Sequence, residues 1–190
     1  ADFTFQFPDE APTLSISGRR VVVFGLKPNW ANGWLERLMW ATDVLTARDG
    51  TEQRVGLRTK PRRSLEFSIL VGSADAALLD VLLSAWQSRV YALPIWPDKG
   101  VLTTAIAAGS TVIPLTTTNL EYEADGLLVI GTDSRTTEAA EVLSIASNAV
   151  TLKQPLLQPW PAGAFVTPAR TARLRITQAV SWVTDAIATA

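Results

Sequence analysis

Apolar residues recur at every second position in several stretches of this chain, and glycine, proline, asparagine or aspartate separates these stretches. Near the start, Phe3, Phe5 and Phe7 alternate with polar residues until Pro8, and the same period holds over 172–182. Side chains alternate between the two faces of a strand, whereas a helix repeats every 3.6 residues. The chain is therefore expected to be mainly β, with the segment at 172–182 as one long strand.

The clearest alternation lies within 35–71. Residues 54–60 place apolar and basic side chains on opposite faces, and 65–71 resumes the alternation after a turn. We predict a long antiparallel hairpin with a basic tip at Pro61-Arg62-Arg63. A turn at Asp49-Gly50 makes 40–45 a further strand of the same meander. A shorter hairpin is expected upstream, from Leu14 through Ser17-Gly18 to Val23.

One segment has helical rather than strand spacing. Leu78, Leu79, Leu82 and Trp86 follow an aspartate in the expected first turn, so a single α-helix packed on the sheet is predicted over about 74–89. After residue 101 the sequence becomes acidic and rich in Thr and Ala, with short apolar runs between turn signals, which is typical of a small barrel or sandwich.

The predicted fold class is mainly β with one packed α-helix. An antiparallel sheet or sandwich is assigned to 1–101 plus 169–190, and a small β-barrel-like domain is inserted at 102–168.

Composition limits the chemistry. The 190 residues are 47% hydrophobic, enough to bury a core, but they include no Cys and no His. This excludes disulfides, thiolate nucleophiles, Ser-His-Asp triads and the usual zinc sites. Neither glycine-rich phosphate motif is present. Glu138 and Glu141 stand three apart, on opposite faces of a strand. We therefore expect no catalytic, cofactor or metal residues, and a protein that is not an enzyme.

Charge is unevenly distributed although the net charge is only −1. Residues 18–63 carry ten Lys/Arg against four Asp/Glu, while 102–168 carry two against six. Arg is the commoner cation, and its guanidinium favours protein interfaces. A basic and an acidic segment on one chain can pair head to tail with a second copy; an unevenly charged, solvated surface is the alternative. No apolar run reaches the roughly 18 residues of a membrane span.

The basic cluster and two nearby tryptophans form the predicted partner interface. The tryptophans lie in a loop at 25–34 that either exposes them or folds them onto the core. Nucleic-acid binding is disfavoured by the net charge of −1, and seven Trp also allow a carbohydrate-binding surface. The interface residues are Arg54, Arg58, Lys60, Arg62, Arg63, Trp30 and Trp34.

Several strings give a resemblance to a known class of proteins. Trp40-Ala41-Thr42-Asp43-Val44-Leu45, the following 49–54, Ala92-Leu93-Pro94-Ile95-Trp96-Pro97-Asp98 and the segment 126–169 resemble tail proteins of long-tailed bacteriophages. The resemblance implies a structural component of a distal tail or baseplate, assembled in the host bacterial cytoplasm and located in the virion.

On that resemblance, identical copies form a ring or hub and contact other tail and baseplate proteins. Arg58, Arg62 and Arg63 are then expected at a subunit or partner contact. The alternative function is a carbohydrate- or receptor-binding module of a virion.

Overall fold

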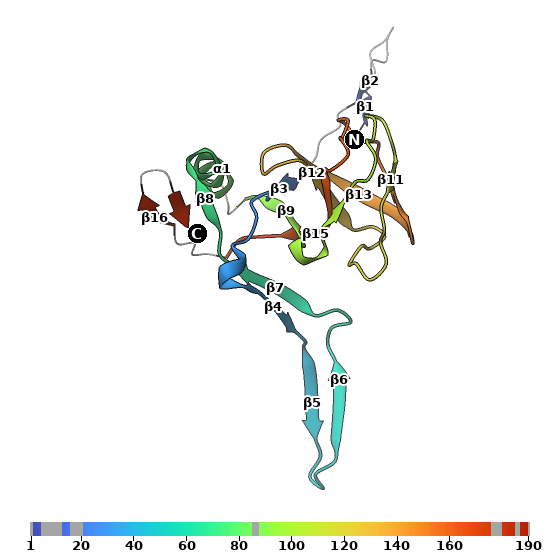
Figure 1. Cartoon of the computed structure of the whole chain (residues 1–190). Helices are drawn as coiled ribbons and strands as arrows, with labels where there is room; N and C mark the ends of the chain where they lie inside the picture. Colours follow the sequence, from blue (N-terminus) through green and yellow to red (C-terminus); the bar gives the residue numbers. More distant parts are fainter. Residues whose placement is uncertain are drawn as a thin grey trace. The chain divides into compact units, whose positions relative to one another are not determined.

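A computed structural model describes residues 2–4, 13–15, 21–84, 88–175, 180–184 and 187–189. These residues are mainly β with one α-helix, as predicted (Figure 1). The chain divides into two compact units. The first comprises Ala1–Gly25 and Ala77–Gln178, and the second comprises Leu26–Ala76 and Ala179–Ala190. The predicted insertion at 102–168 stays a prediction.

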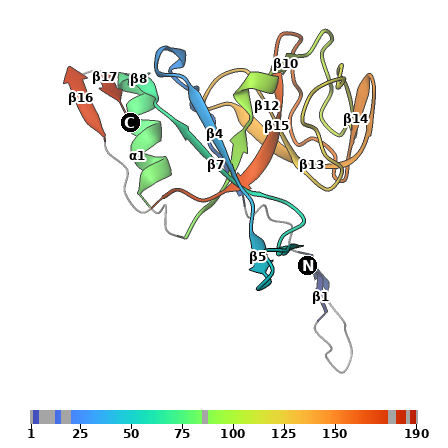
Figure 2. The ribbon, with the colours of Figure 1, turned by 90° about the horizontal axis from the view of Figure 1, so that it is seen from below.

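An eight-stranded sheet dominates the first unit. Its strand order is β11-β14-β13-β12-β15-β9-β3, and β10 also pairs with β15. Figure 2 shows β12 and β15 side by side. The strands are β3 (Val21–Val23), β9 (Val90–Pro94), β10 (Gly100–Val101), β11 (Val112–Pro114), β12 (Leu127–Gly131), β13 (Thr137–Ala146), β14 (Ala149–Leu152) and β15 (Phe165–Ala172).

The core of the first unit comes largely from residues 102–166. Leu128, Ile130, Val142 and Val150 are fully buried on neighbouring strands, and Trp160 closes over them from a loop. Burial of these side chains provides the main stabilisation of the unit. The apolar runs between turn signals therefore do form one packed core, as their spacing suggested.

The predicted barrel is wrong, because these strands form an open sheet among the described residues. Closing a barrel would require β15 to pair with an outer strand such as β11. Both edges of β15 are already occupied: β12 pairs along one edge, and β9 and β10 pair along the other. The sheet therefore extends beyond the predicted domain at 102–168 and includes β9 and β3, which come earlier in the sequence.

The sheet is also mixed rather than purely antiparallel. β3 pairs with β9 in parallel, from Val21 opposite Val90 to Val23 opposite Ala92. The predicted hairpin from Leu14 to Val23 is wrong as well, since β2 (Thr13–Ser15) pairs instead with β1 (Asp2–Thr4). Local alternation identified β3 as a strand but contained no information on its distant partner.

The helix α1 (Ser73–Leu83) buries one face through Ala76, Leu79 and Leu82. It is shorter than the predicted 74–89: Ser84 lies in a turn, and 85–87, including Trp86, lie outside the described residues. Side chains that follow the helix donate hydrogen bonds to its last carbonyl groups. Arg89 Nη1 donates to the carbonyl oxygen of Val81 at 2.5 Å, and the Tyr91 hydroxyl donates to that of Leu82. These bonds satisfy acceptors that the helix leaves open at its end.

The described strands of the second unit form a three-stranded sheet and a long β-hairpin. The sheet has the order β16-β17-β8 and joins β8 (Leu70–Gly72) to two strands from the far end of the sequence, β16 (Ser181–Thr184) and β17 (Ile187–Thr189). The segment predicted as one strand over 172–182 is not continuous: β15 ends at Ala172, 173–175 and 180 lie outside strands, β16 begins at Ser181, and 176–179 lie outside the described residues. In the part of the chain that the structure describes, no helix has the length and hydropathy of a membrane span.

The hairpin differs from the predicted one in its pairing. β4 (Trp34–Met39) pairs with β7 (Arg62–Phe67), and β5 (Thr42–Thr46) pairs with β6 (Glu52–Gly56). The turn at Asp49-Gly50 is confirmed, whereas the predicted basic tip at Pro61-Arg62-Arg63 is wrong. These three residues lie partway along the hairpin, between the β5–β6 ladder and the β4–β7 ladder.

Candidate interaction arm

We call the hairpin from Trp34 to Phe67 the arm; Figure 1 shows β5 and β6 extending the ladder of β4 and β7. Its outer turn is well closed. Thr51 donates to Asp49 Oδ1 from its hydroxyl at 2.7 Å and from its backbone N–H at 3.0 Å, and Gly50 adopts a φ of 85°. These hydrogen bonds lower the pKa of Asp49.

Large apolar side chains are exposed along the whole arm. Directly paired residues share a face, so Leu35 and Met39 belong to one face of the β4–β7 ladder and Leu38 to the other. Every residue of β5 and β6 is exposed, as are the residues of β4 after Trp34, whereas β7 is half-buried at Arg63–Leu65 and Phe67. The exposed large apolar residues of the arm are Leu35, Leu38, Met39, Trp40, Val44, Leu45, Val55 and Leu57.

The base of the arm is partly packed through aromatic contacts. Trp34 stacks on Phe67 with ring centroids 4.7 Å apart and planes inclined by 14°. Trp30, in the short helix η1 (Trp30–Asn32), approaches Trp34 at 6.4 Å but stays 56% exposed. Trp34 is therefore half-buried against Phe67, whereas Trp30 is open to solvent.

The two ladders are separated by unequal connections, two residues at 40–41 and five at 57–61. A single backbone hydrogen bond, from Leu57 N–H to the carbonyl oxygen of Ala41 at 2.9 Å, crosses this interruption. Trp40 is 62% exposed and Leu57 63% exposed here. We call this part of the arm the elbow, consisting of Met39, Trp40, Leu57, Arg58, Lys60 and Arg62.

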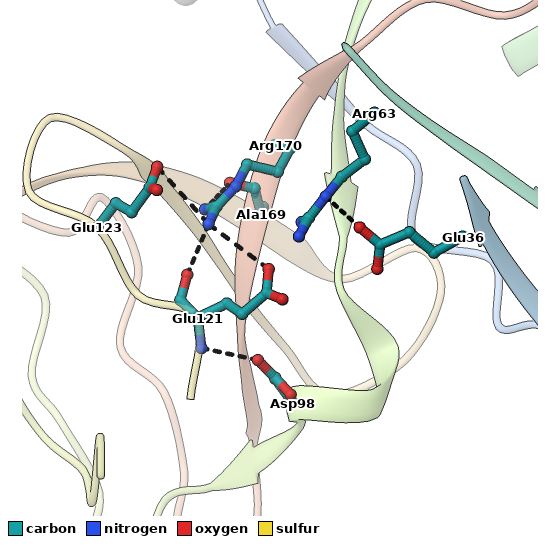
Figure 3. A network of polar contacts seen from close by, with 7 residues as sticks. All are labelled: Glu36, Arg63, Asp98, Glu121, Glu123, Ala169 and Arg170. Atoms are coloured by element: carbon teal, nitrogen blue, oxygen red, sulfur yellow. Dashed lines mark hydrogen bonds and ion pairs between the residues drawn. The ribbon is translucent and has the colours of Figure 1, made fainter. Parts of the chain in front are cut away.

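The predicted cations fall into two groups. Arg54 pairs with Glu52 at 3.1 Å, and Arg63 pairs with Glu36 at 2.5 Å (Figure 3) with its side chain only 26% exposed. By contrast, Arg58, Lys60 and Arg62 form no ion pair with any residue that the structure describes. Three uncompensated cations therefore stand beside exposed apolar side chains at the elbow.

A second charged surface lies in the first unit. Arg170 contacts the carboxylates of Glu121 and Glu123 at 3.7 and 3.6 Å and donates to the carbonyl oxygen of Glu121 at 2.9 Å (Figure 3). Lys153 contacts Asp125 at 2.7 Å, and its hydrogen bond lowers the pKa of that carboxyl while raising its own.

Lys153 also contacts Glu141 at 3.5 Å. Four carboxylates thus share two cations. We call Glu121, Glu123, Asp125 and Glu141 the acidic ridge.

Neither Glu138 nor Glu141 is placed for acid–base chemistry with the other. They do lie on opposite faces of β13, with Glu138 only 4% exposed and Glu141 exposed. Glu138 is fully engaged as an acceptor from Leu157 N–H, Gln158 N–H and Trp160 Nε1. Among the described residues, no three Asp or Glu side chains are grouped as metal ligands would be.

All seven predicted interface residues lie in or beside the arm, and the structure adds residues that sequence reasoning missed. These are Met39, Trp40 and Leu57; the sequence predicted strands at 40–45 and 54–60, but not the exposure of these side chains. Their exposure depends on whether a second layer covers the hairpin, which no local pattern reveals. The available signal was the basic run from Arg54 to Arg63, which contains five cations and no carboxylate.

A scan against models of known protein families finds no match to this chain, and a search of curated proteins also finds none.

Proposed function

We propose that the protein is a structural component of a bacteriophage tail tip or baseplate, joined to neighbouring subunits through its arm. The observation that carries this proposal is the exposure of large apolar side chains on both faces of the arm. A two-stranded hairpin has little stability of its own in water, and a contiguous exposed apolar surface marks an interaction site.

The energetic argument favours an assembled arm. Burying the exposed part of one Leu or Trp side chain contributes on the order of 1 kcal/mol, at about 25 cal/mol per Å². The eight exposed residues together supply several kcal/mol, which helps to offset the entropy lost on association. Trp, Met and Arg are also the residue types enriched at interface centres.

The assignment to a phage tail depends on the resemblance of the sequence strings described above. It makes a homo-oligomeric ring or hub the expected assembly, with other tail and baseplate proteins as further partners and the virion as the final location. An arm that reaches a neighbour fits this role, because a ring requires each copy to hold the next.

Self-association of the full chain tests the proposal. Trp40→Ser with Leu57→Ser is expected to weaken association at least tenfold in light scattering and native mass spectrometry. Leu157→Ser with Val101→Ser removes two exposed apolar side chains outside the arm and should leave association unchanged. A wild-type chain that remains monomeric at high micromolar concentration would contradict a homo-oligomeric ring.

The exposed indoles of Trp30 and Trp40 favour one alternative, a carbohydrate- or receptor-binding module. Sugar rings stack on exposed indole faces, so ligand binding would quench tryptophan fluorescence. A glycan array combined with Trp30→Ala and Trp40→Ala separates the two functions. Saturable quenching that both substitutions abolish, in a chain that does not self-associate, would replace the assembly proposal.

A further inference from the structure

The elbow and the acidic ridge have complementary charges. The elbow has three cations, Arg58, Lys60 and Arg62, without an ion-pair partner among the described residues. The ridge has four carboxylates that share Lys153 and Arg170. One surface therefore has an excess of positive charge, and the other an excess of negative charge.

Both surfaces also offer apolar contact area. Trp40 and Leu57 flank the elbow cations, and Leu143 is 53% exposed on β13, two residues after Glu141. The register of β13 against β14 shifts between Val142 and Ser144, so Leu143 occupies an irregular position within the ladder. Such an extra residue redirects a side chain away from the regular pleat.

We propose that the elbow of one copy docks on the acidic ridge of a second copy of the same chain. This inference rests on the proposed function and names the surface that receives the arm. Arginine guanidinium groups bind carboxylates in a planar, bidentate geometry. At the contact Trp40 and Leu57 pack beside Leu143, while Arg58, Lys60 and Arg62 face Glu123, Asp125 and Glu141.

The contact joins two different patches of one chain and is therefore heterologous. Each copy presents one elbow and one ridge, so each copy can hold one neighbour and be held by another. A heterologous contact of this kind generates a ring if its rotation closes and a filament if it does not. A pair related by a two-fold axis would need two such contacts at once.

Charge reversal tests the proposal on the full chain. Arg58→Glu, Lys60→Glu and Arg62→Glu make the elbow acidic; Glu123→Lys, Asp125→Lys and Glu141→Lys make the ridge basic. Each triple variant alone is expected to associate on the order of 100-fold more weakly than wild type, since like charges then meet. When mixed, the two variants present complementary surfaces in both directions and should associate again.

A matched control carries the same change in charge elsewhere. Lys27→Glu, Arg135→Glu and Arg173→Glu replace three exposed cations outside the arm and the ridge and should preserve association. A second readout uses the wild-type chain: raising the salt from about 50 mM to about 500 mM should weaken association progressively. Circular dichroism verifies that each variant retains its strand content.

The outcomes separate this inference from the proposed function. If Trp40→Ser with Leu57→Ser abolishes association but the mixed charge variants do not recover it, the arm binds another surface and this inference fails alone. The inference would also be overturned if neither added salt nor the elbow charge reversal weakened self-association. It would be overturned as well if the control variant lost association as much as the elbow variant. A wild-type chain that never self-associates contradicts both.

Discussion

Glu138 is an acidic residue in the core of the first unit, where a polar group without hydrogen-bond partners is costly. Its carboxylate accepts hydrogen bonds from the backbone of Leu157 and Gln158 and from the indole of Trp160. One side chain thereby fixes the loop that carries Trp160 over the core. Sequence reasoning predicted that Glu138 and Glu141 face opposite ways, but it could not show that Glu138 serves as a structural acceptor.

Replacing this carboxylate should have a large effect on stability. Glu138→Ala leaves buried donors without a partner, and we expect the free energy of unfolding to fall by about 2–4 kcal/mol. Glu141→Ala, which removes an exposed carboxylate of the same strand, should change it by about 0.5 kcal/mol or less. Chemical denaturation measures both values, and equal effects would refute the role assigned to Glu138.

Gly25 occupies a position with no room for a side chain. A Cβ atom there would lie 2.5 Å from the carbonyl oxygen of Ser134, in the turn between β12 and β13. Because a backbone atom is the obstacle, we expect Gly25→Ala to reduce the melting temperature, with a cost of about 1–3 kcal/mol. Gly72→Ala meets no atom within 4 Å and serves as the control; a similar loss there would argue against the steric explanation.

The arm turn should respond to acid. Hydrogen bonds from Thr51, first from its hydroxyl and then from its backbone N–H, lower the pKa of Asp49. Because the folded pKa is depressed, the stabilisation is present above the unfolded pKa of about 3.9 and is lost as the pH falls through the folded value. An NMR titration of Thr51 should follow this loss. Thr51→Val should raise the pKa of Asp49; an unchanged pKa would show that the hydroxyl contributes nothing.

Among the elements, the arm shows how far local pattern reaches. Asp49-Gly50 was predicted as a turn because Asp-Gly readily adopts the positive φ that such a turn requires. The Pro61-Arg62-Arg63 run predicts a second tip, but proline also ends a ladder without reversing the chain. The nested pairing of β4 with β7 joins segments more than twenty residues apart. Alternation predicts which side chains of a strand share a face, but it does not predict which strand pairs with it.

An arm without its partner should exchange its amide hydrogens quickly. We expect β5 and β6 to exchange much faster than β12 and β13 in dilute protein, since both faces of the outer ladder are exposed. In concentrated, assembled protein the elbow amides should become protected. Hydrogen exchange with mass spectrometry measures both conditions. Full protection of β5 and β6 at the lowest concentration would contradict an arm that lacks cover in the monomer.

At the scale of the whole molecule, the sheet of the first unit shows how far the predicted domain at 102–168 agrees with the structure. The predicted core in 102–168 is real, whereas the predicted barrel closure is not, because closure depends on which strand takes the last edge of β15. β9 and β10 pair along that edge. Both strands lie outside the predicted insertion at 102–168, so the sequence of the insertion alone could not predict this pairing.

Shortening the arm tests whether assembly and folding are separable. Met39 and Arg62 lie directly opposite each other, so an Asn-Gly turn can replace 40–61 as a two-residue hairpin loop. We expect this variant to keep its far-ultraviolet circular dichroism and a melting temperature close to that of wild type, while losing self-association. A large drop in melting temperature would mean that the arm also supports the fold.

The order of the strands has a consequence for synthesis on the ribosome. Among the residues that the structure describes, β8 pairs only with β17, and Ile187 is translated 120 residues after Phe67 completes the arm. A nascent chain therefore displays a finished apolar hairpin long before the neighbouring small sheet can close. Shielding by a chaperone during that interval would keep the hairpin from capturing other unfinished chains.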